Sequence, residues 1–387
     1  MTEKKRQIGI IFGGRSGEHS VSLKSARFVI DQLDLDRYEI TQIGINRQGE
    51  WLSGPSVHGA MLKADQTNED FVPEELSQID VVALLPTPTR NGLYRLLRTQ
   101  HGSHGEVIGL LSKLDVLFPV LHGTFGEDGT VQGLFELADV AYVGSGVVGS
   151  AVAMDKAVFA DIMIANTIPI VDTTLLLRSE LQADMDWALD HAEAVGDYPL
   201  FIKPANLGSS VGISKVRSRA DLIEGLMEAA QFDRRVIVQK GMDVREIEIS
   251  VLGNDQPEAS VCGEVLPGAE FYSYDAKYHN DRSQTVIPAD IPEDVAAQMR
   301  GYAVQAFKAL DLAGLARVDF FLEKGTNRVY LNEINTMPGF TEISMYPMLW
   351  EASGLSGSQL VDRLVDLAWE RKAQRDATSH QFRREAD

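Results

Sequence analysis

Cysteine and long apolar runs are scarce in this chain. Its 387 residues include one cysteine, Cys262, which rules out an intramolecular disulfide and is typical of proteins in a reducing compartment. No run approaches the roughly 18 apolar residues that a membrane-spanning helix needs. The first residues, MTEKKRQ, lead straight into a short apolar strand pattern and contain no apolar segment of the secretory-signal kind. We therefore expect a cytoplasmic protein that does not span a membrane.

Basic residues are also scarce relative to acidic ones. The chain has 36 Lys and Arg residues against 56 Asp and Glu residues, a net charge of −20. Because affinity for nucleic acids and anionic membranes depends on Lys and Arg, this balance argues against both kinds of partner. The sequence contains no HExxH or Walker A motif and no Ser, His and Asp in an order that suggests a covalent nucleophile. Zinc-protease and covalent-nucleophile chemistry are therefore not expected.

What is present is the composition of an ordinary soluble globular protein. Hydrophobic residues make up 44% of the chain and charged residues 24%, and the length predicts two to four domains. Residues 7–13 read as a buried strand, followed by a Gly-rich turn and a helix over about 20–33, which predicts an α/β fold. Further strands are predicted at 80–85 and 115–121, and the polar segment 86–106 is predicted to be a loop or insertion.

Chemistry-bearing side chains concentrate in one segment, ARVDFFLEKGTNRVYLNEINTMPG, which predicts two strands joined by a polar turn. If the hairpin is centred near Thr326, Asp319 lies opposite Glu333 and Arg317 lies opposite Asn335, all on one face. Opposed carboxylates repel one another, whereas carboxylate and amide oxygens are the ligands that Mg²⁺ and Ca²⁺ take. The segment therefore predicts a divalent-cation site, and the neighbouring arginine indicates an anionic ligand.

The alternative for these polar residues is an ordinary solvated strand face. Four of them on one face, between apolar neighbours, favour the cation site. On this reading, Asp319→Asn or Glu333→Gln should lower metal-dependent turnover far more than stability, because each relieves a like-charge repulsion.

Local positive charge is the second signal. Lys156, Lys203, Lys240 and Lys277 lie in short strand-adjacent segments, and a Gly/Ser turn at 208–212 follows one of them. Backbone N–H groups in such a turn can approach an anion closely. Each lysine alone is consistent with a solvated surface residue, and the turn alone with a plain hairpin. Together they are candidates for holding a triphosphate.

Three sites in the N-terminal part of the chain have both a structural and a functional interpretation. Glu18, in the Gly-rich turn, either favours the following helix electrostatically or binds a ligand. His122 ends a strand, where ligands gather in open α/β sheets. Residues 127–129 (EDG) are predicted to cap the next helix rather than to bind metal.

Taken in order, these segments resemble a known family. GGRSGEHSVSL, FPVLHGTFGEDGTVQG, MDK, KPANLGSSVG, YDAKY, RVDFFL and NEINTMPGFT are similar to the motifs of the D-alanine–D-alanine ligases of the ATP-grasp superfamily. The resemblance covers residues 8 to about 365. It implies an α/β, three-domain ATP-grasp architecture, with a Rossmann-like N-terminal domain at 1–144, a central domain at 145–239 and a C-terminal domain at 240–387 that carries a lid loop at 268–285.

The resemblance also implies roles for individual residues. The positions that match the family's nucleotide site are Lys156, Lys203, Gln239, Lys240, Met242, Glu246, Phe271 and Lys277. The magnesium ligands match Asp319, Glu333 and Asn335. The catalytic positions match Glu18, Ser209, Tyr278, Arg317 and Gly339. The neighbours of the two amino-acid substrates match Val21, His122, Ser344 and Met345.

The implied reaction uses ATP and two Mg²⁺ or Mn²⁺ ions and joins two D-alanine molecules for peptidoglycan synthesis. A D-alanine carboxylate takes the γ-phosphoryl group, and the amine of a second D-alanine then displaces phosphate. A tyrosine at Tyr278 accompanies an amine acceptor in this family, which favours the dipeptide over an ester. Gln239 departs from the family, which usually has glutamate there to accept from the adenine amino group. Alternatives are a ligase with D-lactate or D-serine as acceptor and a non-catalytic nucleotide sensor; a homodimer is also consistent with the resemblance.

Overall fold

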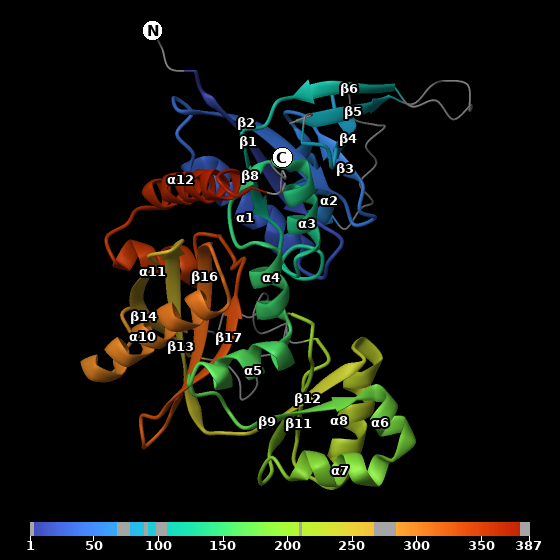
Figure 1. Ribbon diagram of the computed structural model, residues 1–387, viewed down its shortest axis with the longest axis vertical. Helices are drawn as coiled ribbons and strands as arrows, with labels where there is room; N and C mark the ends of the chain where they lie inside the picture. The colour runs from blue at the N-terminus through green and yellow to red at the C-terminus, as the bar shows by residue number, and fades with distance from the viewer. Residues whose placement is uncertain are drawn as a thin grey trace, which may run out of the picture.

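The computed structural model describes most of the chain in three sheets with flanking helices (Figure 1). Four predicted site residues, Ser209, Phe271, Lys277 and Tyr278, lie outside the described residues. Within the described part, no helix combines the length and apolar character that a bilayer crossing needs. The described residues are 4–67, 78–88, 92–97, 107–208, 211–266 and 284–379.

The first sheet has eight strands in the order β6-β5-β4-β3-β2-β1-β7-β8. Its central strand β1 pairs in parallel with β2 and β7, so the predicted α/β start is confirmed. The strands are β1 (Arg6–Gly13), β2 (Tyr38–Ile45), β3 (Trp51–Ser53), β4 (Asp80–Leu84), β5 (Leu93–Leu97), β6 (Val107–Ser112), β7 (Val116–Val120) and β8 (Ala141–Tyr142). The helices of this part are α1 (His19–Gln32), α2 (Val57–Thr67) and α3 (Thr130–Ala138).

The prediction of a loop or insertion over 86–106 was wrong in part, because β5 lies inside it. This strand pairs antiparallel with β4 and β6 and extends the parallel core at one edge. Leu93 is fully buried there. The polar turn residues on both sides of LYRLL obscured a five-residue strand whose stability comes from its neighbours rather than from its own pattern.

The second sheet is antiparallel, in the order β11-β10-β12-β9, and forms a separate lobe with its own core (Figure 1). Buried side chains such as Leu176, Ile202 and Val238 pack against Leu222 and Leu226 of helix α8 (Arg219–Phe232). The strands are β9 (Thr173–Leu177), β10 (Leu200–Pro204), β11 (Ser214–Val216) and β12 (Arg235–Lys240). Two short helices, α6 (Arg178–Ala183) and α7 (Met185–Glu193), complete the lobe.

The third sheet has the order β15-β14-β13-β16-β17. Its core includes Phe159 and Met163 from helix α5 (Lys156–Ala165), which lies between the second and third sheets in Figure 1. The strands are β13 (Val244–Gly253), β14 (Glu258–Leu266), β15 (Gln284–Val286), β16 (Gly314–Glu323) and β17 (Val329–Asn335). The remaining helices here are α4 (Val147–Met154), α10 (Glu293–Ala309) and α11 (Met345–Ala352).

A β-bulge in β17 decides which way the acidic residues face. The pairing passes from Asp319 opposite Glu333 to Phe320 opposite Leu331, so Asn332 is an extra residue on β17. Without it, Glu333 would continue the buried face of Leu331, because strand side chains alternate. The bulge instead turns Glu333 to the half-exposed face, where Asp319 also lies.

Helix α12 (Gly357–Asp376) returns the chain to the first sheet (Figure 1). Leu360 and Leu364 are fully buried in the same core as Ile8 and Phe12 of β1. Because the helix also contacts β13 and β16, it fixes the first sheet to the third. The second sheet has no such attachment to α12 in the described contacts.

Ion pairs support this contact at the far end of α12. Glu136 of α3 accepts hydrogen bonds from Tyr142, Arg371 and Arg375. Burial alone would raise the pKa of Glu136, but the Tyr142 hydrogen bond and the charges of the two arginines outweigh it and lower the pKa.

We expect Glu136→Gln to reduce the unfolding free energy at pH 7 by about 1–3 kcal/mol, since hydrogen bonds to a charged acceptor are lost. A carboxylate whose pKa is lowered in the folded state stabilises the fold above its ordinary pKa, near 4.5, and loses this effect as the pH falls through the folded value. The wild type should therefore lose more stability than Glu136→Gln between pH 7 and pH 4, measured as urea midpoints. Glu258→Gln removes the exposed ion pair with Arg363 on the same helix and is the matched control; an equal pH response in both variants would contradict the assignment.

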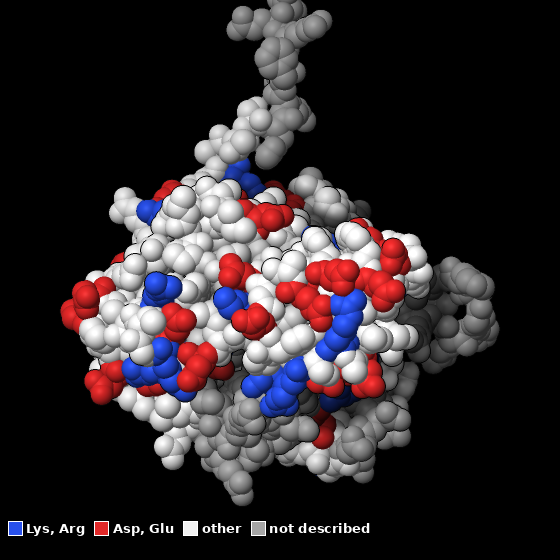
Figure 2. Space-filling model, turned by 90° about the horizontal axis from the view of Figure 1, so that it is seen from below, with Lys and Arg blue, Asp and Glu red and all other residues white. Residues whose placement is uncertain are grey.

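The surface at the end carrying the second sheet has mixed charge. Figure 2 shows Lys and Arg side chains interspersed with Asp and Glu side chains over this face. This face therefore carries no extended field of a single charge among its described residues.

Candidate functional site

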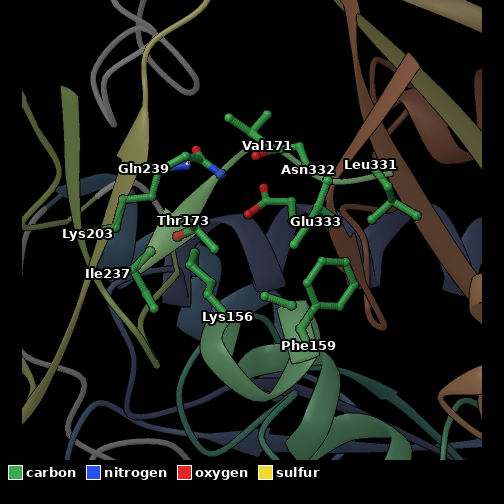
Figure 3. A pocket seen from close by; sticks show the side chains of 12 residues that line it. Lys156, Phe159, Val171, Thr173, Lys203, Ile237, Gln239, Leu331, Asn332 and Glu333 are labelled. Atoms are coloured by element: carbon green, nitrogen blue, oxygen red, sulfur yellow. Dashed lines mark hydrogen bonds between the residues drawn. The ribbon is translucent and has the colours of Figure 1, made fainter. Parts of the chain in front are cut away.

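A cavity opens between the second and third sheets, above the start of α5 (Figure 3). Lys203 and Gln239 face it from β10 and β12, Glu333 faces it from β17, and Lys156 and Phe159 rise from α5. Two lysines therefore stand across a gap from a carboxylate of the predicted cation site. This arrangement suits a polyanion whose charge is shared between lysines and a metal ion.

The lysines are held by defined partners. Lys156 Nζ donates to the carbonyl oxygen of Leu207, 2.9 Å away, at the start of the Gly/Ser turn. Lys203 Nζ donates to Gln239 Oε1 at 2.7 Å. Lys240, the last residue of β12, lies with its Nζ 3.8 Å from Asp172 Oδ2.

The contact with Lys203 fixes the orientation of the Gln239 amide. An ammonium group can only donate, so the atom facing it must be the carboxamide oxygen. The amide nitrogen of Gln239 is then presented to the cavity, as Figure 3 shows. The cavity therefore meets a hydrogen-bond donor at this position, where a glutamate would offer a second acceptor.

Three carboxylates form a row across the third sheet. Asp319 on β16 lies opposite Glu333 on β17 and also opposite Glu248 on β13. In the next row on the same face, Arg317 lies opposite Asn335. Both pairings predicted for β16 and β17 are confirmed. Glu248 was not among the predicted site residues, although REIEIS places it on the same strand face as Glu246.

Arg317 is the charge that holds this row together. Its Nε and Nη2 donate to Oδ1 and Oδ2 of Asp319, both at 2.7 Å, and Glu248 Oε2 lies 2.9 Å from Nε. Burial alone would lower the pKa of Arg317, but the charges of Asp319, Glu248 and Glu333 raise it well above its usual range. The guanidinium is therefore permanently charged and only 18% of its side chain is exposed.

This bidentate pair adds a stability cost to Asp319→Asn, a substitution expected from the sequence to lower turnover far more than stability. The Asp319 carboxylate has an ion-pair partner in addition to its like-charged neighbours. Removing its charge therefore weakens a pair with a largely buried guanidinium, which costs stability.

The amide of Asn335, in the neighbouring row opposite Arg317, is a further oxygen donor on the same face. Its Oδ1 accepts the N–H of Met337 at 2.9 Å, which fixes the side chain and leaves one lone pair. Within the described ranges, no three His, Cys, Asp or Glu side chains approach one another as a metal-ligand set. The predicted donors are two carboxylates and one amide, of the type that Mg²⁺ takes together with water and phosphate oxygens.

A second group of buried polar residues lies where β1 and β7 end. Glu18, 8% exposed, precedes α1, and its Oε2 would be 2.8 Å from a Cβ placed on Gly123. Gly123 has a φ of +74°, a left-handed backbone conformation that favours glycine. Glu127, 7% exposed, accepts the Gly123 N–H. We call Glu18, Gly123 and Glu127, with His122, the first pocket.

The prediction that residues 127–129 cap the following helix was wrong for Glu127. Asp128 instead accepts the N–H of Thr130 at the start of α3 and the N–H of Phe125. Burial, and then the nearby charge of Glu18, raise the pKa of Glu127. The Glu127 side chain turns toward Glu18 because its backbone position is set by the turn from Gly123 to Gly126, which the sequence pattern did not show.

His122 is buried and both ring nitrogens have partners. Nδ1 lies 2.8 Å from the Met337 carbonyl oxygen, and Nε2 lies 3.1 Å from Ser25 Oγ. Burial lowers the pKa of His122. A neutral imidazole with two partners connects the first pocket to the segment that follows β17, and Val21 lies on α1 one turn before Ser25.

The remaining predicted positions lie after β17. Gly339 precedes Phe340, whose N–H bonds to Ser25, and Ser344 Oγ accepts the Thr341 N–H at 2.9 Å. The Met345 side chain is buried with Val265 and Leu349, so this residue faces the core. Met242 follows β12, and Glu246 lies on β13 opposite Phe321.

The chain matches two families along most of its length. Residues 7–145 match the family described as D-ala D-ala ligase N-terminus, and residues 162–366 match the family described as D-ala D-ala ligase C-terminus. A D-alanine–D-alanine ligase of Natranaerobius thermophilus is 44% identical over 379 residues, which cover 98% of this chain and 99% of that protein. One of Acetivibrio thermocellus is 46% identical over 377 residues, with 96% and 97% covered.

Solved structures are similar as well. The VanG D-Ala:D-Ser ligase from Enterococcus faecalis superposes with a TM-score of 0.82 at 33% identity, covering 94% of this chain and 100% of that one. The D-alanine-D-alanine ligase from Coxiella burnetii has a TM-score of 0.79 at 33% identity, with 96% of each chain covered.

Proposed function

This chain belongs to the D-alanine–D-alanine ligase family, with an ATP-grasp fold, and we infer that it joins two D-alanine molecules to D-alanyl-D-alanine, ADP and phosphate for peptidoglycan synthesis. The observation that carries this most directly is the row of Glu248, Asp319 and Glu333 around Arg317, whose end residue Glu333 lines the same cavity as Lys156 and Lys203. Such a site can neutralise a nucleotide's terminal phosphates and a developing oxyanion side by side.

In the first step, a carboxylate oxygen of one D-alanine attacks the γ-phosphorus of ATP. A new O–P bond forms, the bond from the γ-phosphorus to the bridging oxygen breaks, and ADP leaves with that electron pair. Positioning and charge neutralisation dominate phosphoryl transfer. We assign the phosphates to Lys156, Lys203 and Lys277, and the nucleoside to Gln239, Lys240, Met242, Glu246 and Phe271.

Asp319, Glu333 and Asn335 would hold the divalent cation, Mg²⁺ or Mn²⁺, and we propose two ions. The donor types fit such an ion. The ion pair between Arg317 and Asp319 indicates that positive charge is stabilised on this face of the sheet. When bound, the ion supplies Lewis-acid polarisation of the phosphate oxygens.

In the second step, the amine of the other D-alanine attacks the acyl carbon. The π-electron pair of the acyl C=O bond moves to its oxygen, which gives the oxyanion. That pair then re-forms the C=O bond while phosphate leaves with the electron pair of the C–O bond. The leaving phosphate accepts the surplus proton of the amine. We assign Arg317 and the N–H of Gly339 to the oxyanion, a role that usually contributes the largest stabilisation in acyl transfer.

The two substrates need separate recognition. We assign the first ammonium group to Glu18, with Val21 and His122 beside it, and the second carboxylate to Ser344 and to the backbone N–H of Met345. Tyr278 and Ser209 are assigned to a lid that bonds toward Glu18 and excludes water from the acyl phosphate.

The test is an assay of both products. With ATP, Mg²⁺ and millimolar D-alanine, phosphate and dipeptide should appear in equal amounts. D-serine and D-lactate, offered in competition across pH, should be poorer acceptors; a preference for either would assign this chain to a different acceptor class. ATP binding without turnover would indicate a nucleotide sensor and contradict the ligase.

A specific expectation concerns the adenine pocket. Gln239→Glu should lower the KM for ATP by about tenfold, because a carboxylate can serve Lys203 with one oxygen and the 6-amino group with the other. Gln239→Ala is the matched control and should raise the KM, since Lys203 loses its partner. Steady-state kinetics at fixed D-alanine measure both; equal KM values in all three proteins would remove Gln239 from the nucleotide site.

We further propose a cytoplasmic location, where ATP is available, and a homodimer as assembly. As domains we propose residues 1–144, 145–239 and 240–387. Helix α5 packs with the third sheet, which supports its acting as the floor of the nucleotide cavity.

A further inference from the structure

Ser25 is a buried polar residue outside the assigned site. It lies on α1, is fully buried, and contacts two other parts of the fold. Its Oγ is 3.1 Å from Nε2 of His122 at the end of β7, and it accepts the N–H of Phe340, also at 3.1 Å, from the segment after β17. One hydroxyl thus connects three segments that are far apart in the sequence.

The direction of these hydrogen bonds follows from elimination. The carbonyl oxygen of Met337 can only accept, so the neutral His122 ring carries its proton on Nδ1. Nε2 is then an acceptor, so the Ser25 hydroxyl donates to it and uses a lone pair for the Phe340 N–H. The chain of donors runs from Phe340 through Ser25 and His122 to Met337.

This series of hydrogen bonds starts and ends on the same four-residue segment, 337–340. Met337 and Phe340 are its two ends, and Gly339 lies between them. The Met337 N–H is in addition held by Asn335 Oδ1 at 2.9 Å. The backbone around Gly339 is therefore fixed from α1 and β7 of the first sheet as well as from its own strand.

We propose that Ser25 is a positioning residue for the acyl-transfer step, holding the Gly339 N–H where the oxyanion forms. This inference rests on the proposed function and adds a residue to its second step. An oxyanion donor must lie within a few tenths of an ångström of its place, about 2.7–3.1 Å from the oxygen, so a loosened segment loses much of its effect.

The location of Ser25 also connects this segment to the first substrate. Glu18 lies at the start of α1 and Ser25 lies seven residues later, on the same face of the helix. Occupation of the first pocket and placement of the oxyanion donor therefore depend on the same helix. The alternative is a purely structural role, in which Ser25 satisfies buried hydrogen-bonding groups and contributes only to the stability of the fold.

Coupling between the two half-reactions distinguishes these roles. If the oxyanion donor is misplaced, the acyl phosphate still forms but transfers slowly, and water hydrolyses it. Ser25→Ala should then release more ADP than dipeptide, lower the kcat for dipeptide by about tenfold, and leave the KM for ATP unchanged. The experiment measures ADP and dipeptide together in the full-length protein with ATP, Mg²⁺ and D-alanine.

Ser22 provides the matched control. It is fully buried on the same helix, but its hydroxyl accepts the Gly13 N–H and donates to the Val120 carbonyl oxygen, so its hydrogen bonds join α1 to β1 and β7 rather than to the 337–340 segment. Ser22→Ala should lose stability but keep one ADP per dipeptide. Ser25→Thr retains the hydroxyl and should restore coupling.

An ADP to dipeptide ratio of one in Ser25→Ala would overturn the inference while leaving the proposed function intact. If Ser25→Ala does not fold, Ser25→Cys carries the same test, because a thiol fills the site but is a weak donor. Failure of the wild type to form dipeptide would instead overturn the proposed function and the inference with it.

Discussion

Glu333→Gln is expected to lower the kcat for dipeptide formation by about a hundredfold or more while costing the fold less stability than the corresponding change at Asp319. The substitution removes one of three carboxylates that stand in a row with Asp319 and Glu248 near a single guanidinium. The lost charge weakens cation binding, and the repulsion within the row falls. Steady-state kinetics over a range of Mg²⁺ concentrations and thermal unfolding without metal measure the two effects.

Asp319→Asn is the matched control, because it makes the same chemical change on the facing residue. It should lower kcat as strongly, but it should also lower the melting temperature, since Asp319 holds Arg317 through two hydrogen bonds of 2.7 Å. Equal melting temperatures for the two variants would contradict the distinction between the bidentate Asp319 pair and the weaker charge interaction of Glu333 with Arg317. A Glu333→Gln protein with wild-type kcat at every Mg²⁺ concentration would remove that residue from the cation site.

Replacement of Arg317 is expected to have the largest effect on both activity and stability. Arg317→Met should destabilise the fold by about 3–5 kcal/mol, because it leaves Asp319 and Glu248 without their counter-charge in a largely buried place. Turnover should fall by about a thousandfold, since the oxyanion loses a charged donor.

The change in melting temperature on adding a divalent cation distinguishes the loss of a charge from a purely structural defect. Without the guanidinium, the carboxylate row has a net charge that a cation can compensate. Mg²⁺ should therefore raise the melting temperature of Arg317→Met more than that of the wild type. Arg317→Lys retains the charge but not the bidentate geometry, so it should restore most stability and little activity. A Mg²⁺ shift equal to that of the wild type would argue against a cation site in this row.

The row itself could be predicted from local sequence because strand alternation and a short turn determine it. Arg317, Asp319, Glu333 and Asn335 lie within one hairpin, and their pairing was predicted correctly. The bulge at Asn332 could not be predicted, because the position of the extra residue depends on packing of Leu331 and Ile334 on the core side. The prediction that Asp319 and Glu333 share one face was correct, because the extra residue in β17 shifts the pairing by one residue between Phe320–Leu331 and Asp319–Glu333.

Contacts between distant segments escaped prediction. Glu248 approaches Arg317 only because β13 pairs with β16, and no local pattern specifies that neighbour. Glu127 reads as a helix cap, and Ser25 gives no signal in the sequence, until the ends of β1, β7 and β17 meet. For Ser209, Phe271, Lys277 and Tyr278, the family resemblance remains the basis of the assignment.

Helix α12 has a consequence for how the polypeptide acquires its structure during synthesis. The core around Ile8 and Phe12 includes Leu360 and Leu364, so strand β1 is synthesised more than 340 residues before the helix that covers it. Until that helix emerges, an apolar side of the nascent sheet stays uncovered, and this is the interval in which a chaperone would bind. The lobe of residues 173–240, with its own core, can fold earlier by itself.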